Sequence, residues 1–169
     1  MAGVPESEEK RKLHAQLIQM EALMEEKLRE GGSVSFSPKG ASMLPMLRAE
    51  GDRVTLKKPP ARIKTGTVAL FISREGGEER FVLHRLVRRR GEELVFHGDN
   101  RLKPDPPVMA GDVIGVVTGY ESRGKKRSLR APWYLLYKGW MVLTSGFRAA
   151  AFKAQRAIYK AWKKLFRKK

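Results

Sequence analysis

Apolar residues in the N-terminal part of the chain recur at intervals of three and four positions. The residues on this line are Leu13, Leu17, Met20, Met24 and Leu28. Such spacing predicts an amphipathic helix over residues 7–30, with Ser7 as a suitable N-cap and Gly31 after its last turn. We expect this helix to pack on the domain that follows. A partner-binding or membrane-lying helix would show the same stripe, although the glutamates of the segment disfavour an anionic surface.

From residue 34 onward, apolar and polar positions alternate, and β-branched and aromatic residues become common. A period of two in such residues predicts short strands. The expected strands cover residues 34–37, 53–57, 67–73, 80–88, 93–97 and 113–120. Turn-forming Gly, Pro and Asp residues separate these segments. We therefore expect a compact, mainly antiparallel β domain over residues 33–121, flanked by an N-terminal helical segment (1–32) and a C-terminal tail (122–169).

The C-terminal tail contains two further patterned segments. Residues 132–146 are rich in Trp, Tyr and Leu, and Trp and Tyr prefer the boundary between lipid and water. Residues 147–166 predict a helix with a basic face opposite an apolar line. That line is formed by Phe147, Ala151, Ala154, Ile158, Trp162 and Leu165. These faces are typical of a helix that lies in a membrane surface, although a core-packing helix or a nucleic-acid-binding helix stays possible.

Charge is distributed unevenly along the chain. The formal net charge is +17, and no acidic residue follows Glu121. The tail is therefore strongly basic, whereas the rest of the chain is nearly neutral. Phosphate groups of lipids or of nucleic acids are the partners that such a tail attracts. We favour an anionic membrane surface, because the aromatic residues of the tail share its apolar face instead of alternating with the basic residues.

The remaining composition limits the compartment and the cofactors. The chain has no Cys and three His, which excludes disulfides and disfavours a structural zinc site, and it contains no Gly-rich phosphate loop. We expect no metal and no cofactor. The first residues lack the basic and apolar pattern of a secretory signal, and no apolar run reaches the length of a spanning helix. The expected location is peripheral, at the cytoplasmic face of a membrane.

Three parts of the β domain carry candidate chemistry. Ser42 lies in a turn of small residues, and His84 lies in a half-buried strand. Asp99 follows Gly98 in a tight turn, and Asp105 comes six positions later. A hydroxyl, an imidazole base and a carboxylate that orients the base are the groups needed for nucleophilic cleavage of an amide. Each residue also has an ordinary structural explanation, and Arg85 could pair with a turn carboxylate.

The order of these motifs resembles that of the S24/S26 signal-peptidase-like serine peptidases. The matching segments are GASMLPML (40–47), GDRV (51–54), IKTGTV (63–68), VLHRLV (82–87), GDN (98–100) and DVIGVV (112–117). Together they cover about residues 33–120. Bacterial signal peptidases and self-cleaving SOS repressors of this family use a Ser–Lys dyad. The endoplasmic-reticulum and archaeal-like members have His at that position, as this chain does at His84.

The resemblance implies a signal-peptidase/SOS-repressor-like β catalytic domain and endopeptidase activity on a leader peptide, a signal peptide or a membrane-proximal segment. Ser42 would attack the scissile carbonyl after His84 takes its proton, and Asp99 or Asp105 would orient His84. The Ser42 backbone N–H would bind the oxyanion. The family's second donor comes two residues before the nucleophile, where this chain has Gly40. An inactive peptidase-like binding module and a self-cleaving repressor-like regulator are the alternatives.

Overall fold

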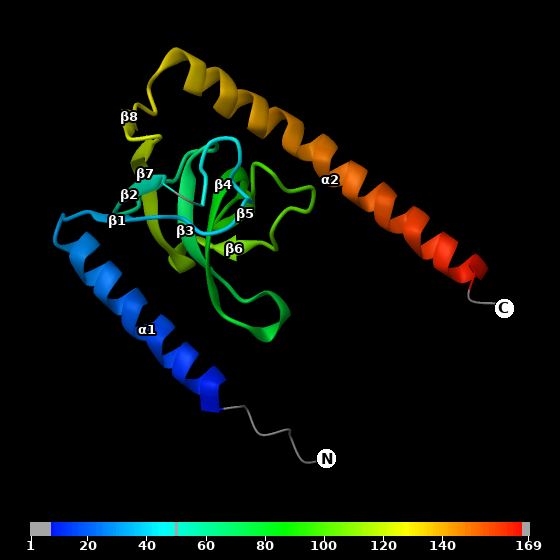
Figure 1. The fold of residues 1–169 in the computed structure, drawn as a ribbon, viewed down its shortest axis with the longest axis horizontal. Helices are drawn as coiled ribbons and strands as arrows, with labels where there is room; N and C mark the ends of the chain where they lie inside the picture. Colours follow the sequence, from blue (N-terminus) through cyan, green and yellow to red (C-terminus); the bar gives the residue numbers. More distant parts are fainter. Residues whose placement is uncertain (1–7, 50, 167–169) are drawn as a thin grey trace.

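The chain folds into one antiparallel sheet and two long helices, which the computed structural model describes over residues 8–49 and 51–166. The elements are α1 (Glu8–Arg29), β1 (Val34–Phe36), β2 (Arg53–Lys57), β3 (Val68–Ser73), η1 (Glu75–Gly77), β4 (Arg80–Arg90), β5 (Glu93–His97), β6 (Val108–Met109), η2 (Ala110–Asp112), β7 (Val113–Ser122), β8 (Lys125–Arg127) and α2 (Pro132–Phe166). Figure 1 shows the sheet between the two helices. The expected mainly β class is confirmed.

Strand order in the sheet is β1-β2-β7-β3-β4-β5-β6, and β8 pairs with β7. All the pairings are antiparallel. The six strands expected from alternation are present, with ends that differ by one or two residues at most. The short strands β6 and β8 were not expected. β8 consists of three exposed basic residues and has no apolar alternation that could have revealed it.

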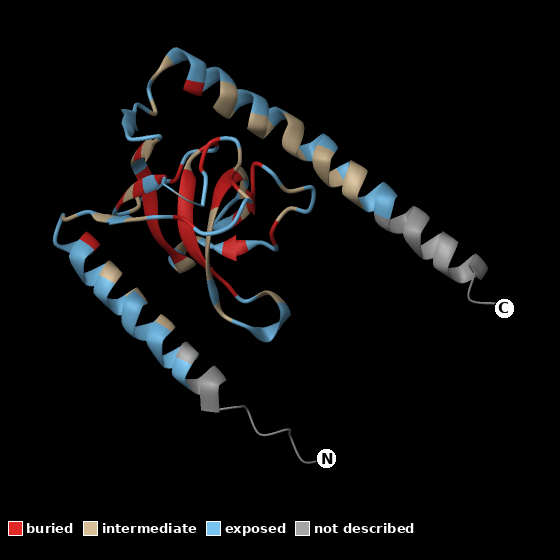
Figure 2. Cartoon of the chain, viewed as in Figure 1, coloured by how far each residue is buried: buried red, intermediate tan, exposed pale blue. Residues whose placement is uncertain are grey.

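The sheet buries a cluster of apolar side chains on each of its faces. Strand β4 contributes to both clusters, because Phe81 and Leu83 pack with one and Val82 and Leu86 pack with the other. This division follows the alternation of side chains along a strand. Figure 2 shows that burial is concentrated in the sheet, while the described parts of the two helices are mostly exposed or intermediate. The faces that alternation assigns to these β4 residues are therefore confirmed.

Helix α1 packs on the sheet mainly through its last turns. Leu28 is 2% exposed and belongs to the first apolar cluster, with Met24 beside it. The expected packing of this helix on the domain is confirmed at that end. Met20 and Leu23 are about half exposed. Ser7, the expected N-cap, lies outside the described residues.

Helix α2 is one continuous element of 35 residues, where the sequence predicted an apolar segment followed by a separate helix. Gly139 and Gly146 lie within it and do not interrupt it. Its first part packs on the domain through Tyr134, which is 3% exposed. The side chains of Ile158, Trp162 and Leu165, in the expected apolar line, lie outside the described residues. No helix in the described part of the chain has a segment long and apolar enough to cross a bilayer.

Candidate active site

His84 is held in a fixed orientation on the central strand β4. It pairs with Ala69 of β3 and is 2% exposed, and Phe71 contacts its ring edge to face at 6.4 Å between centroids. Its Nδ1 lies 2.5 Å from Asp105 Oδ2. Because a carboxylate accepts hydrogen bonds, Nδ1 carries a hydrogen, and in the neutral imidazole Nε2 then has the lone pair that can take a proton.

Asp105 is the carboxylate that contacts the histidine. Its backbone N–H donates to Phe96 O at 2.9 Å, which fixes the loop against the end of β5. Its side chain is 5% exposed, so the short contact to His84 is shielded from water. The sequence left Asp99 and Asp105 as equal candidates for this contact, and the geometry assigns it to Asp105.

Ser42 is positioned by the Gly98-Asp99-Asn100 turn. The Asn100 backbone N–H donates to Ser42 O at 2.8 Å, and Asn100 Nδ2 donates to Ala41 O at 3.1 Å. A methyl group built on Gly98 would lie 2.9 Å from both His84 Nε2 and Ser42 O. Gly98 is therefore the small residue that lets the histidine and the serine turn come together. Alanine at position 98 would force the two apart.

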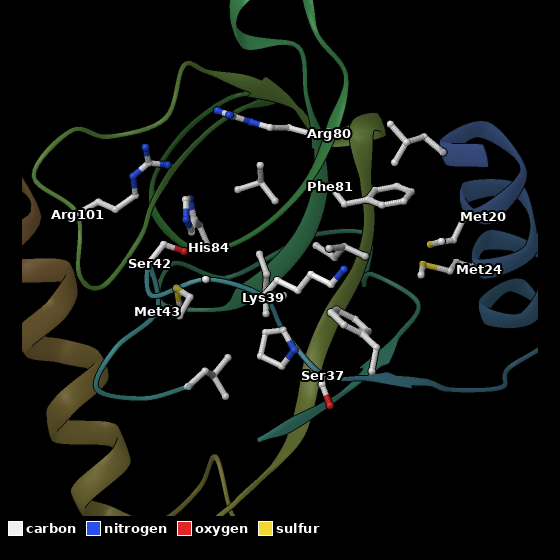
Figure 3. A pocket seen from close by; sticks show the side chains of 18 residues that line it. Met20, Met24, Ser37, Lys39, Ser42, Met43, Arg80, Phe81, His84 and Arg101 are labelled. Carbon is white, nitrogen blue, oxygen red and sulfur yellow. The ribbon is translucent and has the colours of Figure 1, made fainter. Parts of the chain in front are cut away.

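The Ser42 hydroxyl and the His84 imidazole lie at the same end of one cavity (Figure 3). Among the described residues, no hydrogen bond joins Ser42 Oγ to His84. Catalytic hydrogen bonds in substrate-free enzymes are often long and shorten when substrate binds. The Ser42 backbone N–H also makes no hydrogen bond within the described chain, so no protein acceptor would compete with an oxyanion for it.

Asp99 is buried in a different network, on the opposite face of β4 from His84. Arg85 donates to it twice, from Nε to Oδ1 at 2.8 Å and from Nη2 to Oδ2 at 2.6 Å, and the Tyr137 hydroxyl donates to Oδ2 at 2.7 Å. The ion-paired side chains are 0% exposed. Burial and the Asp99 charge raise the pKa of Tyr137, so this hydroxyl remains a donor. The expected pairing of Arg85 with a turn carboxylate is confirmed.

Helix α2 supplies residues that hold the loops of the site in place, and the sequence did not predict this role. Arg148 Nη1 donates to the carbonyl oxygens of Asp99 at 2.8 Å and Gly98 at 3.1 Å. Tyr134 Oη accepts from Arg85 Nη1 at 3.2 Å. Burial lowers the pKa of Arg148. The sequence did contain a signal for these residues. A spacing of three, four and seven positions places four residues on one face of a helix: Tyr134, Tyr137, Met141 and Arg148.

The cavity beside Ser42 has a volume of about 590 Å³. Ser42, His84 and Arg101 lie at one end of it, and Met20 and Met24 of α1 lie at the other (Figure 3). No group of three or more potential metal ligands occurs among the described residues.

The arrangement contains the groups that general-base activation of a hydroxyl requires. An imidazole oriented by a carboxylate stands beside a serine, and a cavity of ligand-binding size opens from them. These contacts come from residues far apart in the chain, on the β1–β2 connection, β4 and the loop after β5. A scan against protein-family models and searches of curated proteins and of solved structures find no match to this chain.

Proposed function

We propose that the protein is a serine endopeptidase with Ser42 as nucleophile, His84 as general base and Asp105 as the residue that orients the base. The observation that carries this proposal is the 2.5 Å contact between His84 Nδ1 and a shielded Asp105 carboxylate, which directs Nε2 toward the Gly98 and Ser42 side. A histidine that served only to fill the core would not need a lone pair facing a cavity that contains a serine.

In the proposed reaction, His84 Nε2 takes the proton of Ser42 as Oγ attacks the scissile carbonyl carbon. The resulting oxyanion accepts a hydrogen bond from the Ser42 N–H, and the Asp105 carboxylate stabilises the imidazolium. His84 then protonates the leaving amine, and the C–N bond breaks to give an acyl-enzyme. A water molecule deprotonated by His84 hydrolyses the ester, and the proton returns to Ser42.

We also propose that the exposed outer face of α2 binds a membrane surface. Five apolar residues on this face are between 50% and 78% exposed: Trp133, Leu136, Trp140, Leu143 and Phe147. They recur at intervals of three and four, so they form one stripe, which we call the outer stripe. An exposed apolar stripe on a basic tail fits the surface of an anionic bilayer. The substrate would then be a leader peptide, a signal peptide or a membrane-proximal protein segment.

Activity is tested with Ser42→Ala and His84→Ala in the full-length protein. Both variants should lose cleavage of a peptide library and reaction with a fluorophosphonate probe. The matched controls are Ser35→Ala and His14→Ala, because Ser35 and the His14 side chain are exposed and lie outside the cavity. Cleavage that continues in Ser42→Ala would refute the proposal. Probe-unreactive protein that still binds peptides would favour a peptidase-like module that does not cut.

Membrane binding is tested with Leu136→Gln and Leu143→Gln together, in vesicles that contain phosphatidylserine. These changes should release the protein into the supernatant on sedimentation. Met109→Gln is the control, because Met109 is also an exposed apolar residue, at 52%, but lies on β6. Vesicle binding equal to that of the unsubstituted protein would refute the role of the outer stripe. Stronger binding to RNA than to vesicles would favour the nucleic-acid interpretation of the basic tail.

A further inference from the structure

We infer that the cavity beside Ser42 selects peptides that carry a large apolar residue and an acidic residue on the same side of the scissile bond. The inference rests on the proposed function, because the same cavity would hold the peptide that is cut. It assigns a substrate class from the lining of the cavity.

The end of the cavity away from Ser42 is apolar and adaptable. Leu17, Met20 and Met24 of α1 face Phe36 and Phe81 of the sheet there. Met20 is 46% exposed, so part of this wall is still open to a ligand. Methionine side chains are flexible and fill irregular shapes, and a cavity of about 590 Å³ accommodates a large side chain. We call this part of the cavity the methionine wall.

The charged residues that line the cavity are all cationic. They are Lys39, Arg80 and Arg101, and no Asp or Glu lies among the described lining residues. Arg80 already donates to Glu75 at 3.1 Å, and Arg101 lies 4.0 Å from Asp105. Lys39 has neither an ion pair nor a side-chain hydrogen bond within the described chain. Its ammonium group is therefore available to a carboxylate supplied by a substrate.

The order of these groups along the cavity sets the order of residues in the peptide. Figure 3 shows the Lys39 ammonium directed into the cavity between the Ser42–His84 end and Met20 and Met24. A peptide with its scissile carbonyl at Ser42 would place an acidic side chain at Lys39 and a large apolar side chain on the methionine wall. A basic residue near Lys39 would be repelled by the unpaired Lys39 ammonium group.

Binding tests this inference separately from catalysis. Full-length Ser42→Ala is titrated with fluorescent peptides that pair a Leu with a Glu, at each separation up to five residues. The best peptide is then compared with versions in which Lys replaces the Glu or Ser replaces the Leu. Each replacement should weaken binding, and the change from Glu to Lys should do so on the order of tenfold at low salt.

Two further substitutions locate the effect in the cavity. Lys39→Glu should reverse the preference so that the Lys-containing peptide binds better, and Met20→Ser should remove the preference for Leu over Ser. Lys57→Glu and Met109→Ser are the matched controls, because both residues are exposed and lie outside the cavity. Both controls should keep the original preferences.

Equal binding of the acidic and basic peptides, no binding of any peptide, or an equal effect of Lys57→Glu would overturn the inference. Cleavage is then followed in the protein with intact Ser42. Ser42-dependent cleavage without an acidic preference would overturn the substrate class alone. If the protein with intact Ser42 binds the acidic peptide selectively but does not cleave it, the peptidase proposal is overturned and the binding preference is still supported.

Discussion

Replacing Asp99 with asparagine would remove a buried negative charge while keeping the shape of the side chain. Asp99 receives three donors in the native structure, two from the Arg85 guanidinium and one from the Tyr137 hydroxyl. In Asp99→Asn, the guanidinium would keep its charge in a site that is 0% exposed. The substitution therefore tests whether Asp99 stabilises the fold or takes part in the chemistry.

The size of the effect follows from the burial of the pair. Removing one partner of a buried ion pair costs about 3–5 kcal/mol, because the other charge is left uncompensated. For a chain of this length, such a loss lowers the melting temperature by roughly 6–20 °C. Arg85 also donates to Gly66 O at 2.9 Å, Tyr134 Oη at 3.2 Å and Met46 Sδ at 3.2 Å, but these neutral acceptors cannot replace the charge of the carboxylate.

The assay is urea unfolding followed by far-ultraviolet circular dichroism. Glu92→Gln is the matched control, because Glu92 accepts from Arg89 at 3.0 Å on the surface, with 66% of its side chain exposed. The control should change stability by less than about 0.5 kcal/mol. In the double variant Arg85→Met with Asp99→Leu, part of the lost stability should return, because no unpaired charge remains.

A loss below about 1 kcal/mol in Asp99→Asn would refute this reasoning, since it would mean that water or another anion compensates Arg85. A variant that folds as stably as the unsubstituted protein but no longer cleaves peptide would also refute it. That result would return Asp99 to the catalytic role that the sequence allowed.

Asp105→Asn should show the opposite pattern, with kcat lower by roughly 10³–10⁴ and a smaller loss of stability, measured by peptide cleavage and urea unfolding. Arg148→Met should speed hydrogen exchange of the 98–101 backbone by at least roughly tenfold and leave β3 unchanged, because three carbonyl contacts are lost. Burial, with a smaller contribution from Arg148, lowers the pKa of His97 below its usual 6.5. The unfolded chain therefore binds this proton more readily, and stability falls as pH drops below about 6.5. His97→Gln should lose less stability than the unsubstituted protein between pH 7.5 and pH 5.5, measured by urea unfolding at each pH.

The sequence predicted those parts of the fold that depend on a pattern between neighbouring residues, such as the alternation of side chains along a strand. Strand β4 alternates strictly enough that Leu83 and Leu86 could be assigned to opposite faces, and both assignments hold. No local pattern predicted that Ser42 and His84 lie close together. That expectation came from the order of the motifs along the chain. The choice between Asp99 and Asp105 could not be predicted, because both carboxylates lie in one loop near the end of β5.

The face of α2 that contacts the domain, with Tyr134 and Tyr137, was not predicted because tyrosine suits two different environments equally well. Tyr134 and Tyr137 suit a lipid boundary, which the sequence favoured, but their hydroxyl groups also suit a buried polar partner. In the fold, these hydroxyls bond Arg85 and Asp99. Arg85 lies on β4, 49 positions from Tyr134, and Asp99 lies in the loop after β5, 38 positions from Tyr137. No local sequence pattern could reveal partners at such separations.

The two faces of α2 connect the proposed membrane surface to the proposed active site without requiring a change of shape. Arg148 holds the turn that positions Ser42, whereas Leu143 and Phe147 point away from the domain and are 78% and 77% exposed. A bilayer that covered the outer stripe would leave the bonds from Arg148 and Tyr137 intact. Attachment and catalysis should therefore be separable. Leu143→Gln should weaken vesicle binding without changing kcat on a soluble peptide, whereas Arg148→Met should lower kcat whether or not vesicles are present.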